Sequence, residues 1–233
     1  MGSLGRNKPL LALVCAALVL LLASMLGQTM NNYLFLDYFK DAKAVAWVNL
    51  ITVGAMLLLA PFISRITVNF GKKEAGVVGT LTAAVFYLLL FFLRVRSIPL
   101  FMGLLFLGTL GMGLFNMIIW AYITDIIDYQ EVTTGKREDG TIYAVYSFAR
   151  KLGQALAGGL GGFALTAIGY ISDAPVQTED VANRIYTVAT LIPGVCYLIV
   201  FSIMLFWYPL SKREVEKNTR ILQEKREADS AAE

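Results

Sequence analysis

The sequence predicts an all-α, polytopic membrane protein with six transmembrane helices. Of its 233 residues, 57% are hydrophobic and only 16% are charged, and the mean hydropathy is +0.64. Water does not keep a chain of this composition monomeric. Six stretches of about twenty residues are nearly free of charge, which is the length that a helix needs to cross roughly 30 Å of hydrocarbon. We therefore expect one six-helix bundle over residues 1–210 and a charged, solvated or partly helical tail over residues 211–233.

The first span runs from about residue 9 to residue 36. Basic residues before it resemble the start of a signal peptide, but the apolar run is too long and lacks a small-residue cleavage site, so we expect it to be retained. Its second half carries four polar residues on one side of a helix, namely Ser24, Gln28, Asn31 and Asn32. Such residues either make hydrogen bonds between helices or line a polar cavity. Gln28 and Asn32 are the candidates for a cavity wall.

The second span covers about residues 44–66 and contains Pro61. Proline is tolerated in a transmembrane helix where neighbouring groups satisfy the freed carbonyl, and we expect a kink there. A short basic turn at residues 71–73 leads to the third span, at about residues 75–93. Basic connectors of this kind belong on the cytoplasmic side of the membrane.

The fourth span, about residues 98–127, carries glycines that allow close helix approach and bending. Asn116 and Trp120 lie one helical turn apart within it. An amide at this depth is costly unless it is hydrogen-bonded or wet. These two side chains therefore either pack against a neighbouring helix or line a cavity.

The fifth span runs from about residue 141 to 170, and the sixth from about residue 186 to 208. On a helical wheel of the fifth span, Lys151 shares its face with small residues, namely Ser147, Ala155, Gly158 and Gly162, while Val145, Leu156, Leu160 and Phe163 lie on the far side. Lys151 is thus predicted to face protein, and Arg150 points about 100° away, toward a different surface. The alternative is that both cations snorkel to the membrane interface.

The distribution of positive charge predicts the orientation of the chain. With the amino terminus inside, inner segments hold thirteen of the 20 Lys and Arg residues and outer connectors hold five, while Arg150 and Lys151 lie within a span. This excess predicts a multi-pass protein of the cell (inner) membrane with both termini in the cytoplasm.

Several function classes have no support in the composition. The net charge of +3 is small and does not indicate a nucleic-acid partner. Cys15 and Cys196 lie in apolar runs far apart and predict no disulfide framework. Because the chain has no histidine, we expect no histidine-based triad and no zinc site of the usual spacing.

Charged residues gather at the inner end of the fourth span and in the connector that follows it. Asp125 and Asp128 close the span, and Lys136 and Arg137 come shortly after. Ion pairs that form in one state and break in another would make a gate, whereas the plainer interpretation is that these charges only mark the end of a helix. No nucleophile or metal-ligand set accompanies the two acids, so the sequence does not indicate an enzyme.

The same region resembles a known family. The segment DIIDYQEVTTGKREDGTIYAVYSFARKLGQALAG, residues 125–158, is similar to the signature region of the glycoside-pentoside-hexuronide:cation symporters, the melibiose permease relatives within the major facilitator superfamily. Their pattern is acid-x-x-Asp-Tyr, a Thr-Gly-Lys-Arg connector and then Lys-x-Gly. The matching positions here are Asp125, Asp128, Tyr129, Thr134, Gly135, Lys136, Arg137, Lys151 and Gly153. Weaker similarity extends over the whole chain.

The resemblance implies that this chain corresponds to the carboxy-terminal six-helix half of a major-facilitator fold. It implies secondary active transport of a sugar or glycoside by alternating access, with no cofactor, and a Na⁺ or H⁺ site in the amino-terminal half. That half, in the same longer chain or as a separate subunit, is an expected partner, together with membrane lipid and the sugar. The candidate substrate contacts are Lys151, Asn116, Trp120, Ser147 and Arg150, and the candidate gating residues are Asp125, Asp128, Lys136 and Arg137.

An alternative function is a non-transporting membrane subunit or scaffold that associates through its helix bundle. The polar residues of the first, fourth and fifth spans argue against it. A scaffold needs small residues for helix packing, but it does not need a lysine within a span.

Overall fold

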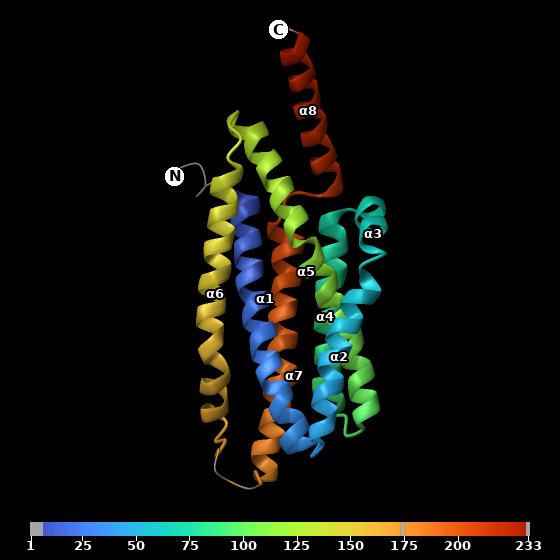
Figure 1. Ribbon diagram of the computed structural model, residues 1–233, viewed down its shortest axis with the longest axis vertical. Coiled ribbons are helices and arrows are strands. Elements are labelled where there is room, and N and C mark those ends of the chain that lie inside the picture. The colour runs from blue at the N-terminus through green and yellow to red at the C-terminus, as the bar shows by residue number, and fades with distance from the viewer. Residues whose placement is uncertain (1–6, 173, 175, 232–233) are drawn as a thin grey trace.

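The computed structural model describes residues 7–172, 174 and 176–231, and every regular element within them is helical (Figure 1). Residues 1–6 and 232–233 of the predicted bundle and tail lie outside the described residues. The elements are α1 (Lys8–Tyr33), α2 (Ala42–Leu59), α3 (Ile63–Phe70), α4 (Lys72–Leu93), α5 (Ile98–Thr134), α6 (Asp139–Ala167), α7 (Glu179–Ser202) and α8 (Lys212–Ala231), with π-helical turns η2 (Leu34–Tyr38) and η3 (Ile203–Trp207) after α1 and α7.

Six long helices form the bundle, as predicted. Five of them are long and apolar enough to cross a membrane: α1 with η2, α2, α4, α5, and α7 with η3. The sixth, α6, has 29 residues but falls short in hydropathy, because Arg150, Lys151 and Gln154 interrupt its apolar part. It nevertheless runs alongside α1 and packs against it (Figure 1). Its place in the bundle therefore identifies α6 as the remaining predicted span.

Two helix boundaries differ from the sequence-based expectation in an informative way. The kink expected in the second span is a full break, since α2 ends at Leu59 and Pro61 lies in the turn before the short helix α3. Helix α5 continues past the expected end of its span to Thr134 and has 37 residues. At about 1.5 Å of rise per residue it is roughly 55 Å long, so it extends beyond the membrane.

The helices pack in two sets of three that make equivalent contacts, one formed by α1, α6 and α7 and the other by α5, α2 and α4. Helix α1 packs against α6 and α7, helix α5 packs against α2 and α4, and α4 packs against α7. Exchanging α1 with α5, α2 with α6 and α4 with α7 maps this pattern onto itself, as expected for two three-helix repeats. One side of the bundle is consequently built by α4 and α7, and the other by α1, α2, α5 and α6.

Glycines allow close contact between α4 and α5. A Cβ atom at Gly79 would lie 2.7 Å from the carbonyl oxygen of Gly111, and one at Gly111 would meet the backbone of Gly79 in turn. Small residues at helix crossings let backbones approach in this way. The two helices are therefore in direct backbone contact, which fixes α5 against the rest of the bundle.

Both ends of the described chain lie at the same end of the bundle, referred to below as the termini end (Figure 1). There Asn7 caps α1 by accepting a hydrogen bond from the Leu10 amide at 3.0 Å. Its side chain also donates to Gln130 at 2.8 Å, and Gln130 donates to Glu138 at 3.0 Å. Asn7 and Gln130 are almost fully buried, so this chain of bonds ties the start of α1 to α5 and to the start of α6.

The tail is more ordered than the sequence suggests, because α8 is a helix of 20 residues attached at its base. The Lys212 amide donates to Glu74 of α4 at 3.3 Å, and the Lys212 ammonium donates to the carbonyl of Val68 at 2.8 Å. Asn218 and Leu222 are buried on the face that packs toward α5. The remaining faces of α8 are exposed and charged.

Candidate functional site: a central cavity and a charged network

Two adjoining cavities, together the central cavity, lie between α1, α2 and α5. Their volumes are about 500 Å³ and about 370 Å³, and both are lined by Ser24, Gln28, Thr52 and Met112. This size is typical of small-molecule sites, which range over roughly 300–1,000 Å³. The central cavity is therefore large enough for a mono- or disaccharide.

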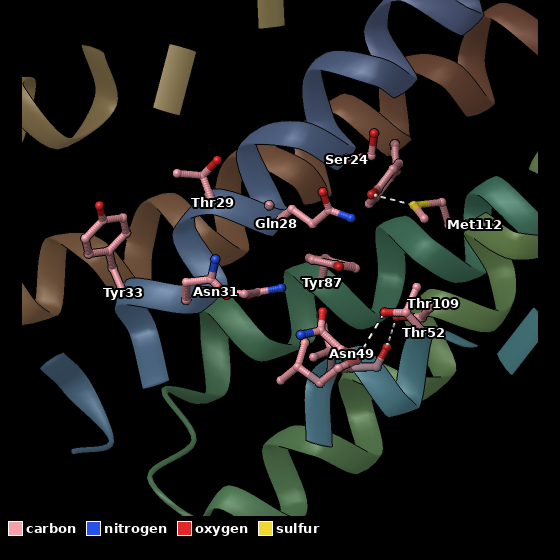
Figure 2. Close-up of a pocket in the computed structure, with 15 residues that line it drawn as sticks. Ser24, Gln28, Thr29, Asn31, Tyr33, Asn49, Thr52, Tyr87, Thr109 and Met112 are labelled. Carbon is pink, nitrogen blue, oxygen red and sulfur yellow. Dashed lines mark hydrogen bonds between the residues drawn. The ribbon is translucent and has the colours of Figure 1, made fainter. Parts of the chain in front are cut away.

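Amide and hydroxyl side chains dominate the wall of the larger cavity. Figure 2 shows Gln28 of α1 and Asn49 of α2 beside it, and Asn32 also lines it. The hydroxyls of Thr52 and Thr109 donate to carbonyl groups of their own helices. In contrast, the side-chain amides of Gln28, Asn32 and Asn49 make no hydrogen bond within the described part of the chain. They are therefore available to a polar ligand.

The smaller cavity is lined by Trp120, Tyr146 and Arg150, which belong to an aromatic cluster with a cation. Trp120 of α5 stacks on Tyr143 of α6 with ring centroids 5.5 Å apart and meets Tyr146 edge-on at 5.8 Å. The guanidinium carbon of Arg150 lies 5.9 Å from the centre of the Trp120 ring, a cation–π arrangement. Asn116 also lines this cavity, and its amide donates to the Met112 carbonyl at 3.3 Å.

The structure separates the candidate substrate contacts into two groups. Asn116, Trp120 and Arg150 line the smaller cavity. Of the two predicted cavity-wall residues, Asn32 lines the larger cavity and Gln28 lines both. Ser147 and Lys151 line neither of the two. Lys151 is exposed, and its ammonium forms no ion pair among residues 7–172, 174 and 176–231.

Lys151 was predicted to face protein, and the described part of the chain leaves its face of α6 uncovered. Helix α6 packs on α1 through a different stripe, Gly153, Ala157 and Gly161. A Cβ atom at Gly153 would lie 2.8 Å from Leu18, whereas one at Gly158, on the stripe of Lys151, would meet nothing within 4 Å. The two small-residue stripes run side by side, and the one with Lys151 is uncovered.

The apolar face of α6 points outward, as predicted. The exposed fractions of Phe148, Leu156 and Phe163 are 69%, 62% and 75%. Side chains of this kind are compatible with lipid contact. The stripe of Lys151 thus lies between the lipid-facing side chains and the side chains that line the cavity.

A second cluster, at the termini end, contains the candidate gating residues. Asp125 is 4% exposed and forms an ion pair with Lys72 of α4, with 2.5 Å between Oδ1 and Nζ. The Tyr122 hydroxyl donates to the Lys72 carbonyl at 2.8 Å. The pairing was not predicted, because 53 residues separate the two partners. The sequence did place the basic turn at residues 71–73 on the same side of the membrane as Asp125, and this placement could have suggested the pair.

Arg137 holds three carboxylates at the end of α5. Its guanidinium lies 3.1 Å from Asp128, 2.8 Å from Glu131 and 3.0 Å from Asp139. The hydrogen bond with Glu131 is the main cause that raises the pKa of Arg137 above its ordinary value. Arg226 of α8 approaches Glu131 at 3.7 Å. Ion pairs between the inner helix ends were expected from the charges there, and the structure shows Arg137 paired with Asp128, Glu131 and Asp139, with Arg226 of α8 close to Glu131.

Lys136 is the candidate gating residue that makes no ion pair in the described chain. It is exposed, and its backbone amide donates a hydrogen bond to the Thr134 hydroxyl at 3.3 Å. The ion pairs seen at the termini end all join elements of this one chain.

Known proteins with similar sequences are transport proteins. The family model for MFS/sugar transport proteins matches residues 1–212. A glucuronide carrier protein homolog of Escherichia coli is 30% identical over 217 residues, which cover 92% of this chain and 47% of that protein. The uncharacterized symporter YjmB of Bacillus subtilis is 31% identical over 219 residues, covering 94% of this chain and 47% of that protein.

A shorter protein is also similar. An uncharacterized 29.9 kDa protein of Pseudescherichia vulneris is 30% identical over 199 residues, which cover 84% of this chain and 71% of that protein. The chain spans about half the length of the carrier and the symporter. The matched residues include the signature segment and the helices that build the central cavity. The chain therefore belongs to the sugar transport proteins of the major facilitator superfamily, in the glycoside-pentoside-hexuronide:cation symporter family.

Proposed function

We propose that this chain is the carboxy-terminal half of a transporter that moves a sugar or glycoside together with Na⁺ or H⁺ by alternating access. The observation that carries the proposal is the central cavity, whose amides at Gln28, Asn32 and Asn49 have no partner in the described chain. A sugar offers many hydroxyl groups to such amides. The names of the similar carrier and symporter support a transported glycoside.

The partner in this proposal is an amino-terminal six-helix half, in the same longer chain or as a separate subunit. In major-facilitator proteins the substrate site lies between two such halves near the midplane of the membrane. The cavity lies on the side built by α1, α2, α5 and α6, where Gln28, Asn49 and Trp120 are exposed. We place the other half over this side, with Lys151 facing it and the coupling-ion site within it.

The termini end is the cytoplasmic end in this proposal, and the protein lies in the cell (inner) membrane. The excess of Lys and Arg at this end supports the orientation. The test is labelling from one side of the membrane: a cysteine at Lys217 should react only from the cytoplasm and one at Glu179 only from outside. The reverse result would invert the proposed topology.

Ligand protection tests whether the cavity binds a glycoside. In a variant with both native cysteines replaced by alanine, a single cysteine at Asn49 should react with a maleimide more slowly when a transported glycoside is present. A cysteine at Lys217, exposed on α8, is the control and should react at an unchanged rate. The scaffold alternative predicts equal rates at Asn49 with and without glycoside, and this result would contradict the proposal.

A further inference from the structure

Arg150 is the single charged residue among the described residues that line the central cavity. The other lining residues of both cavities are polar uncharged, aromatic or aliphatic. Within the described ranges Arg150 forms no ion pair, and its side chain donates no hydrogen bond to protein. Its guanidinium therefore lacks a counter-charge in the described part of the chain.

The aromatic cluster holds this cation at the cavity wall. Tyr143, Tyr146 and Arg150 follow one another at spacings of three and four residues, so they share one face of α6. Trp120 of α5 contacts all three, and the guanidinium carbon lies 5.9 Å from its ring centre. A cation–π contact compensates part of the cost of desolvating a cation, but it uses none of the five N–H donors of arginine.

We propose that Arg150 binds the acidic group of an anionic glycoside, and so makes this half selective for a sugar that carries a carboxylate on its ring. The inference rests on the proposed function and deepens it. A guanidinium presents paired N–H groups that match a carboxylate. The carboxylate binds Arg150, the sugar ring lies beside Trp120, and the ring hydroxyls reach the amides of Gln28 and Asn116.

Lys151 does not compete for this role in the described structure. Although it is adjacent in sequence, it lies on the uncovered stripe of α6 and lines neither cavity. The alternative partner for Arg150 is a carboxylate of the amino-terminal half. These two possibilities differ in a measurable way, because a protein carboxylate would make Arg150 matter equally for acidic and neutral sugars.

The test compares two ligands that differ only at the acidic group. Equilibrium dialysis of p-nitrophenyl β-D-glucuronide and p-nitrophenyl β-D-glucoside against the purified chain in lipid nanodiscs gives both affinities. Hydrogen bonds to charged groups predict that the glucuronide binds roughly 10- to 100-fold more tightly. Arg150→Gln should remove this preference by weakening glucuronide binding far more than glucoside binding, and Arg150→Lys should keep part of it.

Arg65→Gln is the matched control, since it removes an exposed cation on α3, away from the cavity. It should leave both affinities unchanged. Equal binding of the two ligands by the wild-type chain, or an equal loss of both in Arg150→Gln, would overturn the inference and leave the proposed function standing. Binding of neither ligand would overturn the inference for this chain, and the cysteine-protection and uptake experiments would then decide the proposed function separately.

Discussion

At the scale of single residues, we expect stability to depend on the ion pair of Lys72 and Asp125, because loss of one partner leaves the other without its counter-charge. Asp125 is 4% exposed and Lys72 is 31% exposed. Removing one member of a buried pair leaves an uncompensated charge, which costs more than the pair itself contributes. Lys72 remains in partial contact with solvent, so the effect should be smaller than for a fully buried pair. We expect Lys72→Met to lower the free energy of unfolding by about 1–3 kcal/mol.

Thermal unfolding of the detergent-purified chain measures this effect, and the double variant Lys72→Met, Asp125→Asn should recover much of the loss. The matched control is Arg184→Met, because Arg184 pairs with Asp180 at the surface, where such pairs contribute roughly 0–1 kcal/mol. Equal melting temperatures for the Lys72 and Arg184 variants would show that Asp125 does not depend on Lys72.

Lys151 gives a second prediction at this scale. A cation within a span costs roughly 2.5–3.5 kcal/mol on insertion scales unless it has a partner or a wet surface, and the described chain offers it no partner. We expect Lys151→Ala to lower coupled uptake strongly in the complete transporter while expression and membrane insertion stay normal. Uptake at the wild-type level would instead support snorkelling to the interface.

At the scale of elements, the direct contact of α4 and α5 makes a sharp prediction about glycine. Replacing a helical glycine by alanine normally stabilises a helix by about 1 kcal/mol. Gly103→Ala on α5 should follow this rule, because a Cβ atom there meets nothing within 4 Å. Gly79→Ala should instead destabilise the chain by about 1–3 kcal/mol, because its Cβ would press on the Gly111 carbonyl.

Melting temperatures of the two alanine variants measure this difference. A rise for Gly103→Ala and a fall for Gly79→Ala is the expected result. A rise for both would mean that α4 and α5 are further apart in the membrane than in this structure.

Helix α6 shows how far sequence reasoning reaches at the element scale. Its existence follows from its length and its periodic apolar face, although its hydropathy is low. The face that meets α1 could not be predicted, because the stripe with Lys151 and the stripe with Gly153 are both built of small residues. A helical wheel identifies a stripe that suits packing, but only the neighbouring helices decide which stripe is used.

At the scale of the whole molecule, the six spans and the polar sides of α1 and α5 were predictable from composition and periodicity. The long-range contacts were not, because the pairs of Lys72 with Asp125 and of Asn7 with Gln130 join residues 53 and 123 positions apart. The role of α8 was also missed, since a charged helix with few apolar residues gives no sign of where its base attaches. The attachment depends on Glu74 and on carbonyls at the end of α3.

The incomplete enclosure of the central cavity is the main property of the molecule as a whole. Side-chain amides line it, together with an arginine that has no ion pair among the described residues, and the chain covers 47% of the carrier and of the symporter to which it is similar. Alternating access requires two units that move relative to each other around a site. A single six-helix unit is therefore expected to bind without transporting.

The most direct test is uptake of a labelled glycoside into vesicles under an inward gradient of Na⁺ or H⁺. Vesicles with this chain alone, with an amino-terminal half alone, and with both halves are compared at equal protein content. We predict accumulation only where both halves are present, and its loss when the ion gradient is dissipated. Gradient-driven accumulation by this chain alone, as a monomer, would contradict the account.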